Sequence, residues 1–398
     1  MNYYLQAFLL ILMKLVRHIT LIVTICWLSA CASFISHAIS LEDVALPTGP
    51  YQVGTQIMHM VDNDRTAWYK DGLDGAREMM VRVWYPALRA DEDKKAPYNY
   101  NEVLIGDVIA EGFGIPKTIM RTINKIDGNS WLNATPMEQV FPVLIFSHGH
   151  GALKTQNTTQ MEELASHGYV LFSCDHTYDA GISVFPENRV IRNRTGLPDS
   201  LSDKEKWGIR QVQLGYRVGD VQFLLDEMEK GKYLPQSLRK ILDLDNIGIF
   251  GHSFGGATSV VASIKDKRID AALGLDAWFL PISSSLINSD MNKPFVHLGQ
   301  IAWKEEANYL KLDTLATLNS STSLRLDVKG SSHYDFSDFS QFSKVSKKYG
   351  SGTIESDRIR FIMNNTIRNF FDQNLKKSIS ISLEEYKRLY PEIIIKEY

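Results

Sequence analysis

The chain has 398 residues, of which 44% are hydrophobic and 22% are charged, and its formal net charge at pH 7 is −3. This composition is typical of a globular protein with one sizeable core. The charge is nearly balanced, and no basic stripe with interleaved aromatic residues is present, so the sequence predicts no nucleic-acid partner.

The amino terminus is typical of an export signal. Lys14, Arg17 and His18 precede a short apolar run, 19–28, which ends in small residues before Cys31. A basic region, an apolar region and small residues in this order describe a secretory signal. The segment LSAC also resembles a bacterial lipobox, which predicts cleavage before Cys31 and lipidation of its thiol. We therefore expect a lipid-anchored lipoprotein of the outer membrane or periplasm.

Three alternatives at this end stay open. Translation could begin at Met13, an unlipidated signal could be cut after Ala38, or the segment could remain as an uncleaved membrane anchor. The apolar run is short for a bilayer, which disfavours the anchor. Beyond the signal the chain has one cysteine, Cys174, so the mature fold can form no intrachain disulfide. Its apolar context predicts a buried core thiol.

The remaining patterns predict a single catalytic domain. The expected organisation is a signal at 1–30, a tether at 31–48, the domain at 49–377 and a surface appendage at 378–398. The segment VRVWYP, which ends at Pro86, predicts a strand in an antiparallel amino-terminal part of the sheet. An amphipathic segment between Val103 and Ile123 is expected to be a surface excursion, with a lid or lipid-facing element as the alternative.

From residue 141 onward, apolar strands alternate with helical patterns. Such alternation predicts an α/β protein with a mainly parallel central sheet and helices on both faces. The predicted strands lie at 141–146, 169–174, 247–250, 269–275, 295–298 and 323–328, and the predicted helices at 161–167, 211–229 and 363–375. In the helix 211–229 the expected core contacts are Val212, Tyr216, Val221, Leu224 and Leu225.

The pentapeptide around Ser253, GHSFG, fits the pattern G-x-S-x-G. It stands between an apolar strand and a small-residue helix, which is the context of a nucleophilic serine on a sharp turn. The bare pattern is weak, and a glycine-rich turn is the structural alternative. Its flanks make the nucleophile the preferred interpretation.

A serine at neutral pH needs a base, and the base needs an orienting acid, in the chain order Ser, Asp or Glu, His. We predict His333 as the base, because it follows the last apolar strand in a loop; His297 and His252 are less well placed. For the acid, Asp276 directly follows a strand, but an acid after the next strand is common in this architecture. The residues alone therefore leave Asp276 beside Glu305 and Glu306.

The oxyanion is expected to be bound by two backbone N–H groups, those of Phe254 and His150. His148 and His150 could instead form a metal-binding pair, but Ala152 and Leu153 follow where the metallo-hydrolase pattern would continue. The prediction is therefore an enzyme without metal or other cofactor.

Several segments together resemble the plasma-type (group VII) platelet-activating-factor acetylhydrolases. They are GHSFGGAT, GLDAWFLP, FSHGHGA, ELASHGYV and GSSHYDFSDF, and the resemblance runs from about Gly49 to Phe371. It implies an α/β-hydrolase fold and hydrolysis of short or oxidised sn-2 acyl chains from phospholipids. By motif it implies Ser253 as nucleophile, Asp276 as acid and His333 as base. His150 stands where the animal enzymes tend to have leucine, which implies a more polar pocket wall.

The function expected from the sequence is a serine-dependent ester hydrolase acting through an acyl-enzyme. Its expected partners are a phospholipid or short-chain ester substrate and a membrane surface reached through the lipid anchor. The alternatives are a general short-chain esterase or polyester hydrolase, an acyltransferase with the same residues, and an inactive hydrolase fold that serves as a surface-binding lipoprotein.

Overall fold

The computed structural model describes residues 44–70, 73–88, 94–114, 116–123, 126–341, 350–379 and 381–398. The predicted signal and Cys31 lie outside the described residues, so export and lipidation stay predictions. Within the described part of the chain, no helix has the length and apolar character needed to cross a bilayer.

A single large sheet runs through the molecule. The order of its strands is β14-β13-β12-β11-β10-β6-β7-β2-β1-β4-β3, with β5 beside β2. The central strands β6, β7 and β10 to β13 are parallel, whereas β1, β2 and β14 join in antiparallel register. The strands are β1 (Gln52–Thr66), β2 (Ala76–Leu88), β3 (Lys95–Pro97), β4 (Asp127–Leu132), β5 (Thr135–Pro136), β6 (Phe141–Ser147), β7 (Val170–Cys174), β10 (Leu242–His252), β11 (Ala271–Leu275), β12 (Phe295–Gln300), β13 (Ser323–Val328) and β14 (Ile393–Glu397). This is the predicted α/β class.

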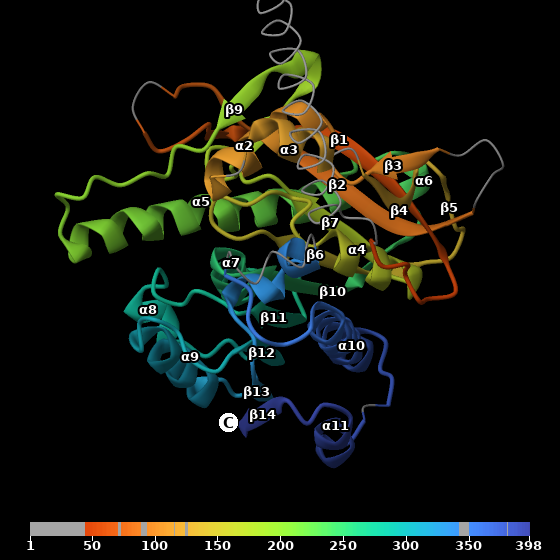
Figure 1. Cartoon of the computed structure of the whole chain (residues 1–398). Helices are drawn as coiled ribbons and strands as arrows, with labels where there is room; N and C mark the ends of the chain where they lie inside the picture. The colour runs from red at the N-terminus through yellow and green to blue at the C-terminus, as the bar shows by residue number, and fades with distance from the viewer. Residues whose placement is uncertain are drawn as a thin grey trace, which may run out of the picture.

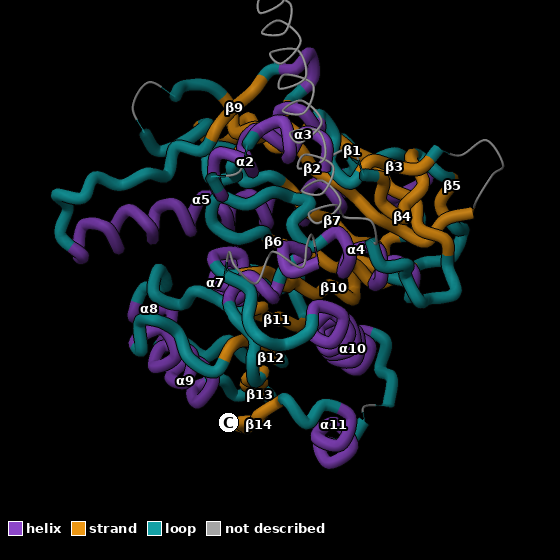
Figure 2. Tube along the Cα trace, viewed as in Figure 1, coloured by secondary structure: helices purple, strands orange, loops and turns teal. Residues whose placement is uncertain are grey.

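Helices cover both faces of the sheet. Figure 1 shows α8 and α9 on one side of β11–β13 and α10 on the other, and Figure 2 shows the same layers by type of structure. The helices are α2 (Glu102–Phe113), α3 (Lys117–Ile123), α4 (Thr158–Ser166), α5 (Asp203–Lys230), α6 (Gln236–Arg239), α7 (Phe254–Lys265), α8 (Ser284–Ile287), α9 (Ala307–Leu318), α10 (Ser356–Leu375) and α11 (Leu383–Leu389). A separate hairpin, β8 (Ile182–Val184) with β9 (Val190–Arg192), and the short helical turns η1 (Pro186–Asn188), η2 (His333–Phe336) and η3 (Asp338–Gln341) complete the elements.

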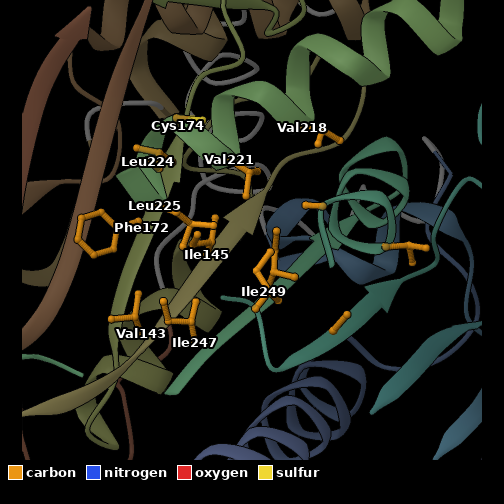
Figure 3. Packing of buried hydrophobic residues seen from close by; sticks show 14 of the residues in the cluster. Val143, Ile145, Phe172, Cys174, Val218, Val221, Leu224, Leu225, Ile247 and Ile249 are labelled. Carbon is orange, nitrogen blue, oxygen red and sulfur yellow. The ribbon is translucent and has the colours of Figure 1, made fainter. Parts of the chain in front are cut away.

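Alternate side chains of the central strands pack into two hydrophobic cores, one on each face of the sheet. On β6, Val143 and Ile145 pack beneath α5 and α7, whereas Leu144 and Phe146 pack against α4 and α10. This alternation follows from the two-residue period of a strand. Figure 3 shows the first core, in which side chains of α5 such as Val218 lie over those of β6, β7 and β10. Because both faces are covered, the central strands are almost continuously apolar.

The buried face of α5 differs from the prediction. Val212 is 46% exposed, whereas Leu214 and Val218 are each 2% exposed. The helix also begins earlier than expected, at a capping box formed by Ser202 and Glu205. Val221, Leu224 and Leu225 are buried as predicted, and the prediction was wrong for Val212. The buried face also carries polar side chains such as Arg217, which hide its apolar period.

The carboxyl terminus also differs from the expected appendage. Strand β14 pairs with β13 and extends the central sheet, and Tyr386, Tyr390 and Ile393 are buried in the core beneath α10. The expectation that 378–398 forms a surface appendage is therefore wrong. The three consecutive isoleucines at 393–395 favour a strand, but their pairing depends on the edge that β13 offers, which is set by the order of strands in the sheet.

The shifted face of α5 gives a matched pair of substitutions. Leu214→Ala should lower the free energy of unfolding by about 2–5 kcal/mol, because it leaves a cavity in the core. Val212→Ala on the same helix should change it by less than about 0.5 kcal/mol. Urea unfolding of the two variants checks this, and equal losses would contradict the assignment of the buried face.

Candidate active site

Ser253 lies on a strained turn between β10 and α7. Its backbone has φ 56° and ψ −117°, in a region that residues other than glycine rarely adopt. Two hydrogen bonds hold it there: its N–H donates to the Leu275 carbonyl, and its carbonyl accepts from the N–H of Trp278, each at 2.9 Å. A Cβ on Gly255 would lie 1.8 Å from the Ser147 carbonyl oxygen, so the close approach of α7 to β6 requires glycine at this position.

His333 and Asp276 form a hydrogen-bonded pair. The His333 Nδ1 lies 2.6 Å from Asp276 Oδ2. Because the carboxylate accepts, Nδ1 carries the hydrogen, and Nε2 is left as the nitrogen that can take up a proton. His333 and Ser253 line the same cavity, so Nε2 is the ring nitrogen available to the serine. The structure thus brings together three residues separated by up to 80 positions in the chain.

A ring of donors surrounds the carboxylate of Asp276. Besides His333, it accepts hydrogen bonds from the N–H and the side-chain amide of Gln300 and from Trp303 Nε1, at 2.9–3.1 Å. The side chain is fully buried. Burial alone would raise the pKa of Asp276, but the hydrogen bond and charge of His333, together with the other donors, lower it below the usual value. The group therefore stays ionised and can stabilise an imidazolium.

Arg217 fixes the loop that follows β6. Its guanidinium donates to the His148 carbonyl at 2.7 Å and to the Gly149 carbonyl at 3.1 Å. In a trans peptide the carbonyl and the next N–H point in opposite directions. Holding the Gly149 carbonyl therefore turns the N–H of His150 away from Arg217. The same guanidinium stacks 4.6 Å from the ring centre of Phe254, the residue that begins α7.

Phe254 and His150 are the two residues whose amides were expected to bind an oxyanion. Phe254 is in the first turn of α7, where N–H groups lack an intrahelical acceptor. Both rings lie beside Trp278, with centroids 5.4 and 6.4 Å from it. The side chain of His150 points to Arg210 and not to Ser253 or His333: its Nε2 lies 3.2 Å from Arg210 Nη1.

Beneath the loop lies a buried network of charges. Asp179 pairs with Arg217, and Asp220 pairs with Arg77, Arg65 and His176. Burial would raise the pKa of Asp179, but the charge and hydrogen bonds of Arg217 outweigh it and lower the pKa. Both carboxylates are ionised, and arginines on β1, β2 and α5 balance their charge. A buried network with all its members paired holds the loop after β6 in one position.

A cavity of about 470 Å³ opens above Ser253 and His333. Its walls are mostly apolar and aromatic, which is the usual character of a small-molecule site. They include Val108 and Ile109 of α2, together with Trp278, Trp303, Tyr334 and Phe339. Helix α2, expected to be a surface excursion, thus forms part of the cavity wall.

The rival residues lie elsewhere. His297 is buried, and its Nε2 accepts from the Ala277 N–H at 3.1 Å, so it is a core histidine. Glu305 and Glu306 are exposed at the start of α9. Cys174 is buried, and burial raises the pKa of its thiol well above the usual value.

His148 and His150 do not act as a pair. His148 Nε2 accepts from the His176 N–H at 3.1 Å, so its Nδ1–H donates to the Gly149 carbonyl at 2.7 Å. Across the described ranges, no group of three or more His, Cys, Asp or Glu side chains is arranged to hold a metal ion.

Sequence reasoning missed the residues that support the site. Gln300 and Trp303 donate to Asp276, Arg217 donates to the loop 148–150, and Asp179 pairs with Arg217. The loop 148–150 is called the oxyanion loop after the role expected of His150. None of these four residues belongs to a recognisable motif. One signal was available in the sequence: Arg217 and Asp220 lie on the predicted core face of α5. A buried charge needs a partner, so these two residues indicated a buried network of charges.

The family model for platelet-activating factor acetylhydrolase, isoform II, matches residues 38–382. The chain belongs to this family. A platelet-activating factor acetylhydrolase of Canis lupus familiaris is 23% identical over 328 residues, which cover 76% of this chain and 70% of the relative. One of Bos taurus is 23% identical and covers 79% and 72%.

A solved structure supports the same conclusion on the fold. A ferulic acid esterase from Streptomyces cinnamoneus matches with a TM-score of 0.74 and 26% identity, covering 88% of this chain and 98% of that chain. The family membership and this likeness identify the protein as an ester hydrolase of the α/β-hydrolase type.

The buried pair Asp179–Arg217 makes stability depend on pH. Asp179→Asn should lower the free energy of unfolding at pH 7 by about 3–5 kcal/mol, because Arg217 loses its neutralising charge. The folded-state pKa of Asp179 is lowered. The contribution of its charge is therefore complete above the unfolded-state pKa of about 3.9 and declines by about 1.4 kcal/mol per pH unit below it. Urea unfolding at pH 7 and pH 3 gives the difference in free energy of unfolding between wild type and variant. This difference should be smaller at pH 3, and an unchanged difference would contradict the pairing.

Proposed function

We propose that the protein is a serine-dependent hydrolase of phospholipids that carry a short or oxidised sn-2 acyl chain. The observation that carries the mechanism is the Asp276–His333 hydrogen bond at 2.6 Å, beside Ser253 in one cavity. The support for the substrate is the family, whose relatives are named platelet-activating factor acetylhydrolases.

The geometry suits a two-step reaction. His333 Nε2 takes the hydroxyl proton of Ser253 as the oxygen attacks the ester carbonyl, and Asp276 stabilises the imidazolium. The N–H groups of Phe254 and His150 bind the oxyanion, each contributing on the order of 3 kcal/mol. His333 then protonates the departing alcohol, leaving an acyl group on Ser253. Water, deprotonated by His333, releases the acid and restores the serine.

The size and lining of the cavity favour a short acyl group. A volume of about 470 Å³ is within the range of roughly 300–1,000 Å³ common for small ligands. Val108 and Ile109 on α2 place an apolar wall opposite the polar groups of the site. An ester with a compact acyl chain can fit between them with its glycerol portion toward the opening, whereas two long chains exceed the space.

A general short-chain esterase is the second candidate. It is favoured by the likeness to the ferulic acid esterase, which is covered almost completely by this chain. The two candidates share the same nucleophile, base and acid, so only the choice of substrate separates them.

Fluorophosphonate labelling tests the nucleophile. Wild type should be labelled on one serine, and Ser253→Ala should abolish labelling because no oxygen remains to attack phosphorus. Ester hydrolysis by Ser253→Ala or His333→Gln should fall by roughly 10⁴- to 10⁶-fold, and that by Asp276→Asn by about 10⁴-fold. Labelling that persists in Ser253→Ala would refute Ser253 as the nucleophile, and wild type that takes no label would favour a role as a binding protein.

A substrate panel separates the two candidates. We expect hydrolysis of phosphatidylcholine with an sn-2 acetyl group, and loss of activity as the sn-2 chain lengthens beyond the space of the cavity. Chromatographic detection of the released acid, beside p-nitrophenyl esters of the same chain lengths, gives the comparison. Activity on the soluble esters alone would establish the general esterase, and transfer to an added alcohol in place of water would establish an acyltransferase.

A further inference from the structure

A chain of hydrogen bonds joins the oxyanion loop to the loop of the base. The Gly149 N–H donates to Gln156 Oε1 at 2.7 Å, Gln156 Nε2 lies 2.8 Å from His252 Nδ1, and His252 Nε2 lies 3.0 Å from the His333 carbonyl oxygen. The two ends of this chain are thus the residue before His150 and the base itself. None of the three bonds involves a reacting atom.

One arrangement of hydrogens satisfies all three contacts. The Gly149 N–H can only donate and the His333 carbonyl can only accept. Gln156 must therefore turn its oxygen to Gly149 and its NH₂ to His252, whose Nδ1 accepts while its Nε2–H donates. Flipping the Gln156 amide would oppose two donors at Gly149 and would leave two acceptors facing each other at His333. The contacts thus define one tautomer of His252.

Packing holds His252 in this role. The side chain is buried, with 2% exposure, and its ring lies 4.5 Å from the His333 ring between centroids. An added Cβ on Gly149 would meet His252 Nδ1 at 3.0 Å, so the oxyanion loop rests directly on this ring. Burial and the nearby His333 lower the pKa of His252 to about 3, although Asp276 acts in the opposite direction. The ring is therefore neutral at working pH, as the acceptor at Nδ1 requires.

The backbone of Gln156 is anchored as well. Its carbonyl accepts from the Asp338 N–H at 3.1 Å, and its N–H donates to the Leu153 carbonyl at 3.0 Å. Its side chain is thus presented from a fixed main chain to the oxyanion loop on one side and the nucleophile turn on the other. His252 directly precedes Ser253 in the sequence. The series of hydrogen bonds therefore passes beside the proposed nucleophile on its way from Gly149 to His333.

We propose that Gln156 and His252 are positioning residues that couple the oxyanion loop to the catalytic base, so that the His150 amide and the His333 ring take their reactive positions together. The inference rests on the proposed serine mechanism and assigns a role to two residues outside the triad. Breaking the first link frees Gly149, breaking the last link frees the main chain of His333, and breaking the middle link uncouples the two. Displacing the His150 amide or the His333 ring should raise the energy of the transition state more than it weakens substrate binding.

The test is a double-mutant cycle with Gln156→Met and His252→Phe, which keep side-chain volume but remove the hydrogen bonds. Each single variant should lower kcat, and the rate of fluorophosphonate labelling, by roughly 10- to 100-fold, less than the 10²–10³ typical of losing an oxyanion donor, because the donor is displaced rather than removed. KM should change little. The double variant should be hardly slower than the worse single one, since both break one chain.

Gln160→Met is the matched control. Gln160 is buried on α4 and bonds Asn157 and Asn364, outside the chain of contacts. The loss of thermal stability should be comparable, but kcat should stay within about twofold, because Gln160 bonds neither Gly149, His252 nor His333. A variant of Gln156 that slows no more than this control, or losses that multiply in the double variant, would overturn the coupling.

Gln156→Glu provides a second route if Gln156→Met does not fold. The carboxylate still accepts from Gly149, but its other oxygen faces His252 Nδ1 and needs a proton there. Its labelling rate relative to wild type should therefore rise when the pH is lowered from 8 to 6, while a constant ratio would contradict the assigned hydrogen positions. Labelling does not depend on the ester chosen. Wild type that is labelled but hydrolyses no ester would refute the proposed substrate, and the labelling rates would still decide the coupling.

Discussion

The site depends on the strained backbone at Ser253. A residue with φ 56° and ψ −117° persists only when the surrounding structure fixes it, and here hydrogen bonds to Leu275 and from Trp278 do so. The same bonds join the end of β10 to the segment that carries Asp276. Because Gly255 allows α7 to touch the Ser147 carbonyl, the turn also sets the distance to the oxyanion loop. One local conformation thus sets the position of Ser253 relative to Asp276 and to the loop after β6.

Two pairs of charged or polar side chains support the site beside this turn. Asp276 has donors on every side, so its charge is retained in a buried setting, where it acts more strongly on His333 than it could in water. Arg217 and Asp179 form a second buried pair, placed under the carbonyls of the oxyanion loop. One pair acts on His333 and the other on the loop expected to hold the oxyanion.

Much of the fold follows from local patterns. The apolar strands from Phe141 to Val328 and the helices between them are visible as alternating runs, and the structure has them in the predicted order. Local patterns failed where long-range pairing decides. Val212 is exposed because the true face of α5 buries Arg217 and Asp220 with partners from β1, β2 and the loop after β7. The isoleucines at 393–395 favour a strand, but only the order of strands in the sheet decides that β14 pairs with β13.

The sequence by itself determined the class of fold and marked Ser253 through its motif, because glycine positions and strand–helix periodicity are local properties. It left the acid open between Asp276 and two glutamates until a family resemblance favoured one. Only the tertiary structure decided which carboxylate meets His333, which donors surround it, and that Gln156 and His252 join the two loops. These are contacts between segments distant in the chain, and their geometry depends on how the strands are ordered in the sheet.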